Sequence, residues 1–266
     1  MKRHVTLLTL AGLGYAFLYL PIATLIVYSF NASDRVMVWD GWSLRWYSAL
    51  LQDASLLRAA ALTLQVATVN AFGATFLGLL GGYVLARHGR FRGRGVFAGM
   101  LAAPLIVPEV VTGLSLLVLF VTLQDSLGWP MARGATTITL AHMTFSSAYV
   151  AVVVQARLAQ LDGALEEAAL DLGATPVRAF LSVTVPLLAP ALIAGWLLAF
   201  SLSIDDLVIA SFVSGPAATT LPMLVFSEVR LGLSPEINAL ATLMILAVAA
   251  LGTVALLLLG RGRTDR

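Results

Sequence analysis

Cysteine is missing from this chain of 266 residues, which excludes disulfides and every metal site built on thiolates. Charged residues are also scarce, at 11% against 59% hydrophobic residues, a composition far from that of soluble globular domains. The net charge is only +2, so it gives no argument for nucleic-acid binding. The few charges that are present are therefore informative through their positions.

Three motifs that would give the chain its own chemistry are absent as well. No G-x-x-x-x-G-K-[ST] phosphate loop occurs, so the chain cannot bind and hydrolyse ATP through that motif. Neither the H-E-x-x-H zinc motif nor the G-x-S-x-G nucleophile motif occurs, which removes the simplest interpretations as a membrane enzyme. We therefore expect no catalytic residue, metal site or cofactor on this chain.

Long apolar segments fill most of the sequence. About 20 apolar residues are needed to cross a bilayer, and six segments reach or approach that length: 5–30, 60–86, 96–122, 136–157, 188–213 and 236–260. The first is too long for the core of a signal peptide, so we expect a retained anchor. The sequence predicts an all-α integral membrane protein with six transmembrane helices. No linker divides residues 1–266, which we expect to form a single transmembrane domain.

Basic residues concentrate on one side of this predicted topology. The positive-inside rule places the side that is richer in Lys and Arg in the cytoplasm. That side carries Lys2, Arg3, Arg87, Arg90, Arg92, Arg94, Arg157, Arg178, Arg261, Arg263 and Arg266. The other side carries Arg35, Arg45, Arg58, Arg133 and Arg230. Both termini and the interval between the fourth and fifth segments are therefore predicted to be cytoplasmic.

That interval, residues 158–187, is polar and lies between two long apolar segments. Residues 165–172 are rich in Ala, Leu and Glu, which favour helix. Gly173 is the residue type that ends a helix in a left-handed cap. Thr175 followed by Pro176 is typical of an N-cap with proline at the first helical position. The pattern predicts two short helices joined at a sharp corner, although an idle solvated loop explains the same residues.

Two consecutive acidic residues, Asp205 and Asp206, lie within the fifth segment. One acidic residue near the bilayer centre costs about 2.5–3.5 kcal/mol on insertion scales, so two are hard to explain as filler. Consecutive residues point about 100° apart on a helix. We therefore expect one to face a pathway while the other bonds to a neighbouring helix, or the helix to be unwound there. A polar clasp between packed helices is the alternative.

A third carboxylate, Glu109, follows Pro108 in the third segment, which Pro104 and Pro108 should kink. The third and fifth segments run in the same direction, so Glu109 can line one path with the aspartates. We include Ser201, from the same stretch as the aspartates, in this candidate pathway. Several spaced carboxylates suit a diamine better than a point ion. Alternatively, Glu109 satisfies backbone groups that the proline kink frees.

Small and polar residues inside the other segments are expected to serve packing. Gly78 and Gly82, and again Gly95 and Gly99, offer small faces for close helix approach. His142, in the fourth segment, is interpreted as a packed or interfacial histidine rather than a ligand.

A known family matches the polar interval. Glu167-Ala168-Ala169, Gly173, Val183, Val185 and Pro186 fit the E-A-A-x3-G-x9-I-x-L-P loop of binding-protein-dependent ABC importer permeases, with Val at both aliphatic positions. The wider chain resembles the polyamine branch of these permeases, and most closely its putrescine permeases. Residues 41–47, 89–93, 166–176, 203–216 and 235–240 carry this resemblance, which covers nearly the whole length.

The resemblance implies a type I importer permease fold, with a five-helix core and an amino-terminal helix, in the bacterial inner membrane. It implies a second homologous permease, two ATPase subunits that bind ATP and Mg, and a periplasmic polyamine-binding protein. The loop at 158–187 would dock on an ATPase through Glu166, Glu167, Ala168, Ala169, Gly173 and Pro186. Putrescine is the implied cargo. Spermidine or another small ligand, and a non-transporting structural subunit, remain alternatives.

Overall fold

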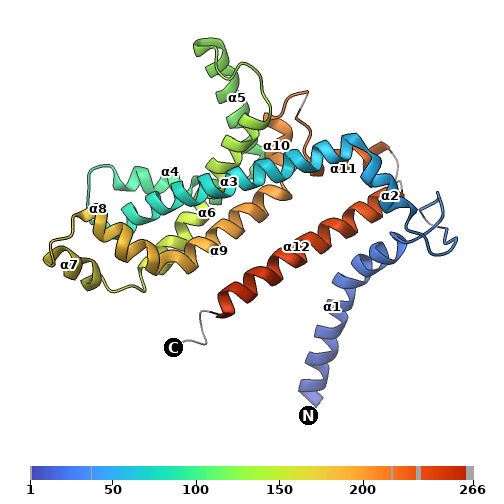
Figure 1. Cartoon of the computed structure of the whole chain (residues 1–266), viewed down its shortest axis with the longest axis horizontal. Coiled ribbons are helices and arrows are strands. Elements are labelled where there is room, and N and C mark those ends of the chain that lie inside the picture. Colours follow the sequence, from blue (N-terminus) through green and yellow to red (C-terminus); the bar gives the residue numbers. More distant parts are fainter. Residues whose placement is uncertain (1, 37, 217, 232–234, 262–266) are drawn as a thin grey trace. The chain divides into compact units, whose positions relative to one another are not determined.

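A computed structural model describes residues 2–36, 38–216, 218–231 and 235–261; Arg263 and Arg266, which the topology prediction counted, lie outside them. Helices make up most of the described residues (Figure 1), and the one strand-like pairing among these is an isolated bridge between Asn31 and Trp42. The chain forms two compact units, residues 1–58 with 224–266 and residues 59–223. The boundaries between the units fall inside two helices, α3 (Ala54–Arg87) and α11 (Leu221–Leu231).

The first unit contains α1 (Lys2–Tyr28), α2 (Arg45–Gln52), most of α11 (Leu221–Leu231) and α12 (Pro235–Arg261). α12 packs against both α1 and α2. Asn31 organises the link between α1 and α2, because its buried side chain donates to Val38 O at 2.6 Å and accepts from the amide of Asp40 at 2.9 Å. Trp46 Nε1 donates to the Asn31 carbonyl oxygen at 2.8 Å. These bonds satisfy backbone groups that the turn leaves free.

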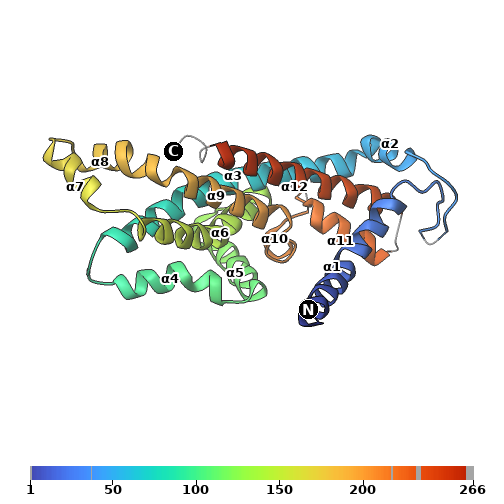
Figure 2. The same cartoon turned by 90° about the horizontal axis from the view of Figure 1, so that it is seen from below.

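The second unit is built around one central helix. Its elements are α3 (Ala54–Arg87), α4 (Arg94–Ile106), α5 (Glu109–Leu127), α6 (Ala135–Leu158), α7 (Ala164–Asp171), α8 (Pro176–Ala179), η1 (Phe180–Thr184), α9 (Val185–Ile204) and α10 (Val208–Val213). Half of the 24 residues of α6 are buried, and α6 packs against α4, α9 and α10 (Figure 2). Most of its buried residues are small or β-branched, which allows neighbouring helices to approach closely, and the larger ones are His142, Phe145 and Leu158.

Five helical stretches of the described chain are long and apolar enough to cross a membrane. They are Leu7–Tyr28, Ala54–Arg87, Glu109–Leu127, Ala135–Leu158 and Pro176–Ile204. Shorter apolar helices lie at Arg94–Ile106 and Pro235–Ala250, and the backbone of α12 continues as a helix to Arg261. The all-α fold class is confirmed, and every predicted segment contains an apolar helix.

The third segment differs from the expectation of one kinked helix over 96–122. The helix stops at Ile106 and a new one starts at Glu109, so α4 and α5 are separate. Val107 has an extended backbone, with φ −78° and ψ 132°. A residue that precedes proline is sterically driven out of the helical region, and Pro108 therefore ends the helix rather than bending it. Pro104, by contrast, lies inside α4.

Gly78 and Gly82 lie where α3 meets α6, as the sequence predicts. A Cβ added at Gly82 would stand 2.8 Å from the carbonyl oxygen of Ala151, and one at Gly78 would stand 2.6 Å from the Cβ of Val150. The backbones are therefore close enough to exclude a methyl group. Gly95 and Gly99 differ, because an added Cβ at either would meet no atom of the described chain within 4 Å.

Replacing Gly82 with alanine should destabilise the chain, because the Ala151 carbonyl oxygen belongs to helix backbone and cannot move aside. Overpacking of this kind costs about 1–3 kcal/mol. Thermal unfolding of the purified full-length chain in detergent should show a lower midpoint for Gly82→Ala. Gly99→Ala is the matched control and should not lower the midpoint, because alanine favours helix and meets no clash there. Equal midpoints for the two variants would contradict the close α3–α6 contact.

Candidate functional site

The polar interval folds as a helix, a corner and a second helix. α7 covers Ala164–Asp171, and Gly173 follows with φ +87°, in the left-handed region that glycine adopts without strain. Thr175 is the N-cap of α8, and its Oγ1 accepts the amide of Arg178 at 3.3 Å. Pro176 occupies the first turn. The predicted corner is therefore confirmed, with Gly173 in the left-handed region and Thr175 as the N-cap before Pro176.

The second helix is longer than expected. α8 continues through the π-helix η1 into α9, so that Pro176–Ile204 forms one uninterrupted helical stretch of 29 residues. Pro186, expected near the end of the loop, lies inside it. Proline has no N–H to donate, and the amide of Val185 bonds to the carbonyl of Phe180, five residues back. The extra residue in this turn lets the helix pass the proline without breaking.

Glu166 and Glu167 face different ways on α7. Glu166 Oε1 lies 3.3 Å from Nε of Arg87, and Tyr83 OH donates to Glu166 Oε2 at 3.4 Å. Arg87 also donates to the carbonyl of Leu161 at 3.3 Å, so the end of α3 holds the start of the interval. The Glu166 and Arg87 side chains are only 20% and 22% exposed, whereas Glu167 is exposed. Glu166 is therefore an anchor within the chain, and Glu167 is the carboxylate that is free to contact a partner.

The rest of the corner presents small and apolar groups to the outside. Ala168 and Gly173 are exposed, and Ala169 is half-buried. The exposed fraction is 90% for Leu172 and 68% for Val177, so two large apolar side chains at the corner are not covered by the described chain. An exposed carboxylate beside exposed leucine and valine is suited to docking against another protein.

The fifth segment breaks at the aspartate pair. α9 ends at Ile204 and α10 begins at Val208, so Asp205 and Asp206 lie in the gap. Asp206 Oδ1 accepts the backbone amide of Ala210 at 2.8 Å. The same oxygen lies 3.1 Å from Nε2 of His142, whose Nδ1 lies 2.7 Å from Oγ of Ser203. The side chains of His142 and Asp206 are 3% and 7% exposed.

The two aspartates have opposite surroundings. Asp205 is exposed, and so is Ser201, which stands four residues earlier and therefore on the same face of α9. Ser203 and Asp206, three residues apart, face α6 through His142. The helix is unwound at the pair and Asp206 bonds to a neighbouring helix, as expected, whereas a pathway beside Asp205 stays a prediction. His142 is packed, as predicted, but its link to Asp206 was not foreseen.

Glu109 opens α5 and is exposed, with no hydrogen bond to its side chain among the described residues. A carboxylate in a first helical turn is favoured by the helix dipole, a structural role that differs from satisfying freed backbone groups. One turn later, a Cβ added to Gly113 would stand 2.8 Å from Cδ2 of Phe212 and 3.3 Å from Cα of Ile209. α5 and α10 are thus in close contact one turn beyond Glu109 and just beyond Asp206.

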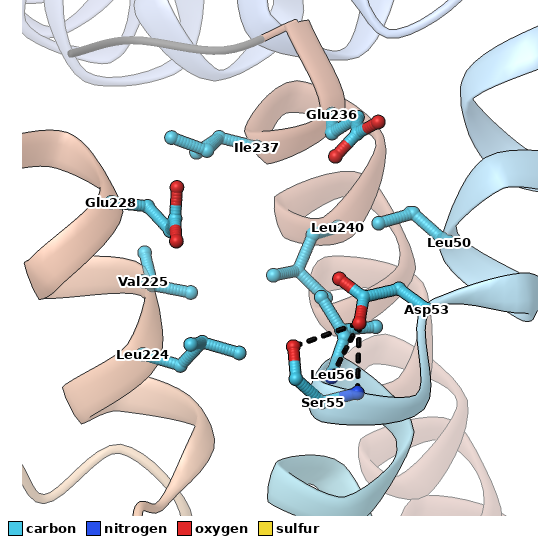
Figure 3. A pocket seen from close by; sticks show the side chains of 10 residues that line it. All are labelled: Leu50, Asp53, Ser55, Leu56, Leu224, Val225, Glu228, Glu236, Ile237 and Leu240. Carbon is cyan, nitrogen blue, oxygen red and sulfur yellow. Dashed lines mark hydrogen bonds between the residues drawn. The ribbon is translucent and has the colours of Figure 1, made fainter. Parts of the chain in front are cut away.

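A separate acidic cavity lies in the first unit, with a volume of about 90 Å³ (Figure 3). Asp53, Glu228 and Glu236 line it together with apolar side chains. The hydroxyl and the amide of Ser55 both donate to Asp53 Oδ1, and these bonds lower the pKa of Asp53, which caps the start of α3. No local signal in the sequence pointed to this cavity, because Asp53 is far along the chain from Glu228 and Glu236 and all three lie outside the predicted pathway.

No group of three or more His, Asp or Glu side chains in the described ranges is placed to hold a metal ion. The candidate site has two parts. One is the exposed corner at Gly173, which suits protein docking, and the other is the break between α9 and α10, with one buried and one exposed carboxylate. Both parts belong to the unit formed by residues 59–223.

Comparison with known proteins identifies the family to which this chain belongs. Residues 78–261 match the family described as the binding-protein-dependent transport system inner membrane component, and the chain belongs to that family. Among curated relatives, the putrescine transport system permease protein PotI of Escherichia coli (strain K12) is 57% identical over 96% of this chain and 90% of its own length. The spermidine/putrescine transport system permease protein PotC of the same strain is 42% identical over 94% and 92%.

Solved structures show the same fold at low identity. A chain of a bacterial ABC transporter involved in the import of the acidic polysaccharide alginate superposes with a TM-score of 0.75, at 18% identity over 95% of both chains. A chain of the bacterial alginate ABC transporter in complex with a pentasaccharide-bound periplasmic protein gives a TM-score of 0.73, at 14% identity over 99% of this chain and 94% of that one. The expected ABC importer permease fold is confirmed.

Proposed function

We propose that this chain is the permease subunit of an ATP-driven importer that carries putrescine across the bacterial inner membrane. The observation that carries the proposal is the 57% identity to the putrescine permease PotI over nearly the whole chain. Putrescine also stands in the name of the more distant relative PotC, so the polyamine class is common to both. Spermidine is the second candidate, and the lower identity to PotC, 42%, makes it the weaker one.

The residues along α9 suit a dication. Ser201 and Asp205 lie on one exposed face and offer a hydroxyl and a carboxylate as hydrogen-bond acceptors for an ammonium group. Glu109 adds a second exposed carboxylate at the start of α5, the helix that packs against α10. Two separated acidic acceptors match two separated ammonium groups, and they lower the cost of moving positive charge through an apolar region.

The chain would work within a larger assembly. We infer that both termini and the corner at Gly173 are cytoplasmic, because the basic residues concentrate on that side. A second homologous permease and two ATPase subunits that bind ATP and Mg would complete the transporter. A periplasmic polyamine-binding protein would dock on the opposite face, in keeping with the binding-protein-dependent family and with the complex seen for the alginate transporter.

The long helical stretch Pro176–Ile204 would couple the corner to the substrate pathway. Pro176–Ile204 leads without interruption from the corner to the break at Asp205, a length of about 43 Å at a rise of about 1.5 Å per residue. Glu166 ties α7 to α3 through Arg87, while Glu167 and Leu172 stay free to dock. Movement of an ATPase against the corner would therefore reach the substrate pathway through one continuous helical stretch.

Replacing Gly173 with valine should uncouple ATP hydrolysis from transport. Valine at φ +87° is strained, because a β-branched side chain is unfavourable in the left-handed region by about 1–2 kcal/mol, so the second helix should leave the corner at a different angle. We expect putrescine uptake by the assembled transporter to fall at least about ten-fold while ATP hydrolysis persists.

Asparagine tolerates the left-handed conformation, so Gly173→Asn is the matched control and should keep most of the uptake. Full transport by the Gly173→Val transporter would refute the coupling role of the corner.

Replacing Asp205 with asparagine should reduce uptake of radiolabelled putrescine about ten-fold or more, because an acceptor for a charged ammonium group becomes neutral. Asp125→Asn removes an exposed carboxylate near the end of α5 that has no role in the proposed pathway, and it should leave uptake unchanged. Membrane levels of each variant should be matched by immunoblot.

Competition with unlabelled spermidine in the same assay distinguishes the two cargoes. Unchanged uptake in both Asp205→Asn and Asp206→Asn would show that the aspartates serve only packing.

A further inference from the structure

We propose that His142 is a positioning residue for translocation: it holds Ser203 and Asp206 against α6, and thereby fixes Asp205 as the carboxylate that meets the substrate. The inference rests on the proposed transport function and extends it to a residue that never touches the cargo. It is drawn from one buried chain of contacts that runs from Ser203 through the imidazole to Asp206.

His142 is held firmly. The residue is 2% exposed, and it belongs to the most buried helix of its unit, between the buried residues Ala141 and Phe145. Each ring nitrogen has one partner, Nδ1 with Ser203 Oγ at 2.7 Å and Nε2 with Asp206 Oδ1 at 3.1 Å. Because an imidazole has only these two polar atoms, its hydrogen-bonding capacity is filled.

The contacts of His142 allow its ring to donate to Asp206 in two protonation states. If the Ser203 hydroxyl donates to Nδ1, the neutral ring carries its proton on Nε2 and donates it to the Asp206 carboxylate. If the ring is protonated, both nitrogens donate, and the bond to Asp206 becomes an ion pair. In both states Asp206 receives a donor from α6 in addition to the amide of Ala210.

The contact between His142 and Asp206 determines the position of Asp205. Asp206 joins α6 on one side and caps α10 on the other, so the orientation of the unwound residues is fixed. Asp205 precedes it directly and is left exposed, without an ion pair among the described residues. If His142 is lost, Asp206 becomes a buried carboxylate short of a donor, and such a group turns toward water or toward a cation. The two aspartates would then compete for the same ammonium group.

Two substitutions separate the two ring nitrogens. The amide of asparagine lies where Nδ1 lies, so His142→Asn can keep the bond to Ser203 but cannot reach Asp206. The amide of the longer glutamine lies near the position of Nε2, so His142→Gln can still donate to Asp206. The two variants are alike in polarity and charge, and they differ in which partner they reach.

The test is the concentration dependence of putrescine uptake by the complete transporter, with the binding protein present and the membrane level of each variant matched. His142→Asn should lower the ratio of maximal rate to KM about ten-fold or more, whereas His142→Gln should stay within about three-fold of the unmodified protein. In a chain that already carries Asp206→Asn, adding His142→Asn should cause no further loss, because the histidine acts through that carboxylate.

Equal losses in His142→Asn and His142→Gln would overturn the proposal, because they would show that the ring only fills space. Unchanged kinetics in His142→Asn would overturn it as well, and so would a full additional loss in the Asp206→Asn background. Failure of the unmodified transporter to import putrescine would instead refute the proposed cargo. The same variants compared on spermidine uptake would then test the role of His142.

Discussion

A helix that stops within an apolar environment leaves amide and carbonyl groups without partners, and these must be satisfied by the protein itself. The break between α9 and α10 meets this constraint with Asp206, which accepts the amide of Ala210, and with His142, which ties Asp206 to α6. The exposure of Asp205 follows from that arrangement. Without the buried contact, neither the direction of α10 nor the identity of the exposed carboxylate would be fixed.

The same unit links this break to the corner at Gly173. One helical stretch, Pro176–Ile204, joins the two, and the π-turn before Pro186 keeps it continuous where proline would otherwise interrupt the hydrogen bonds. At the corner, Glu166 is held by Arg87. On the proposed function, a force applied to α7 would be transmitted along this continuous helical stretch to the residues proposed to contact the cargo. On the proposed assembly, this continuity would let a chain without a phosphate loop respond to ATP hydrolysed on a partner subunit.

Turns and helix caps could be predicted from the sequence, whereas contacts between residues far apart in the chain could not. The turn at Gly173 and the cap at Thr175 depend on neighbouring residues, so they could be predicted. The pairing of His142 with Asp206 joins residues on different helices and left no local signal. Two expectations about proline were wrong for opposite reasons. Pro108 ended a helix that was expected only to kink, and Pro186 was absorbed into a helix that was expected to start after it.

The absence of cysteine allows a direct test of the central claim, that the Ser201–Asp205 face of α9 meets water while the Ser203–Asp206 face is buried. Cysteine would be introduced singly in place of Ser201, Ser203 or Asp205. The assembled transporter would then be treated with a membrane-impermeant cationic thiol reagent, and labelling of this chain would be followed by mass spectrometry. The account predicts labelling at positions 201 and 205, slowed by putrescine, and none at 203. Equal labelling at 201 and 203, or none at 201 and 205, would contradict it.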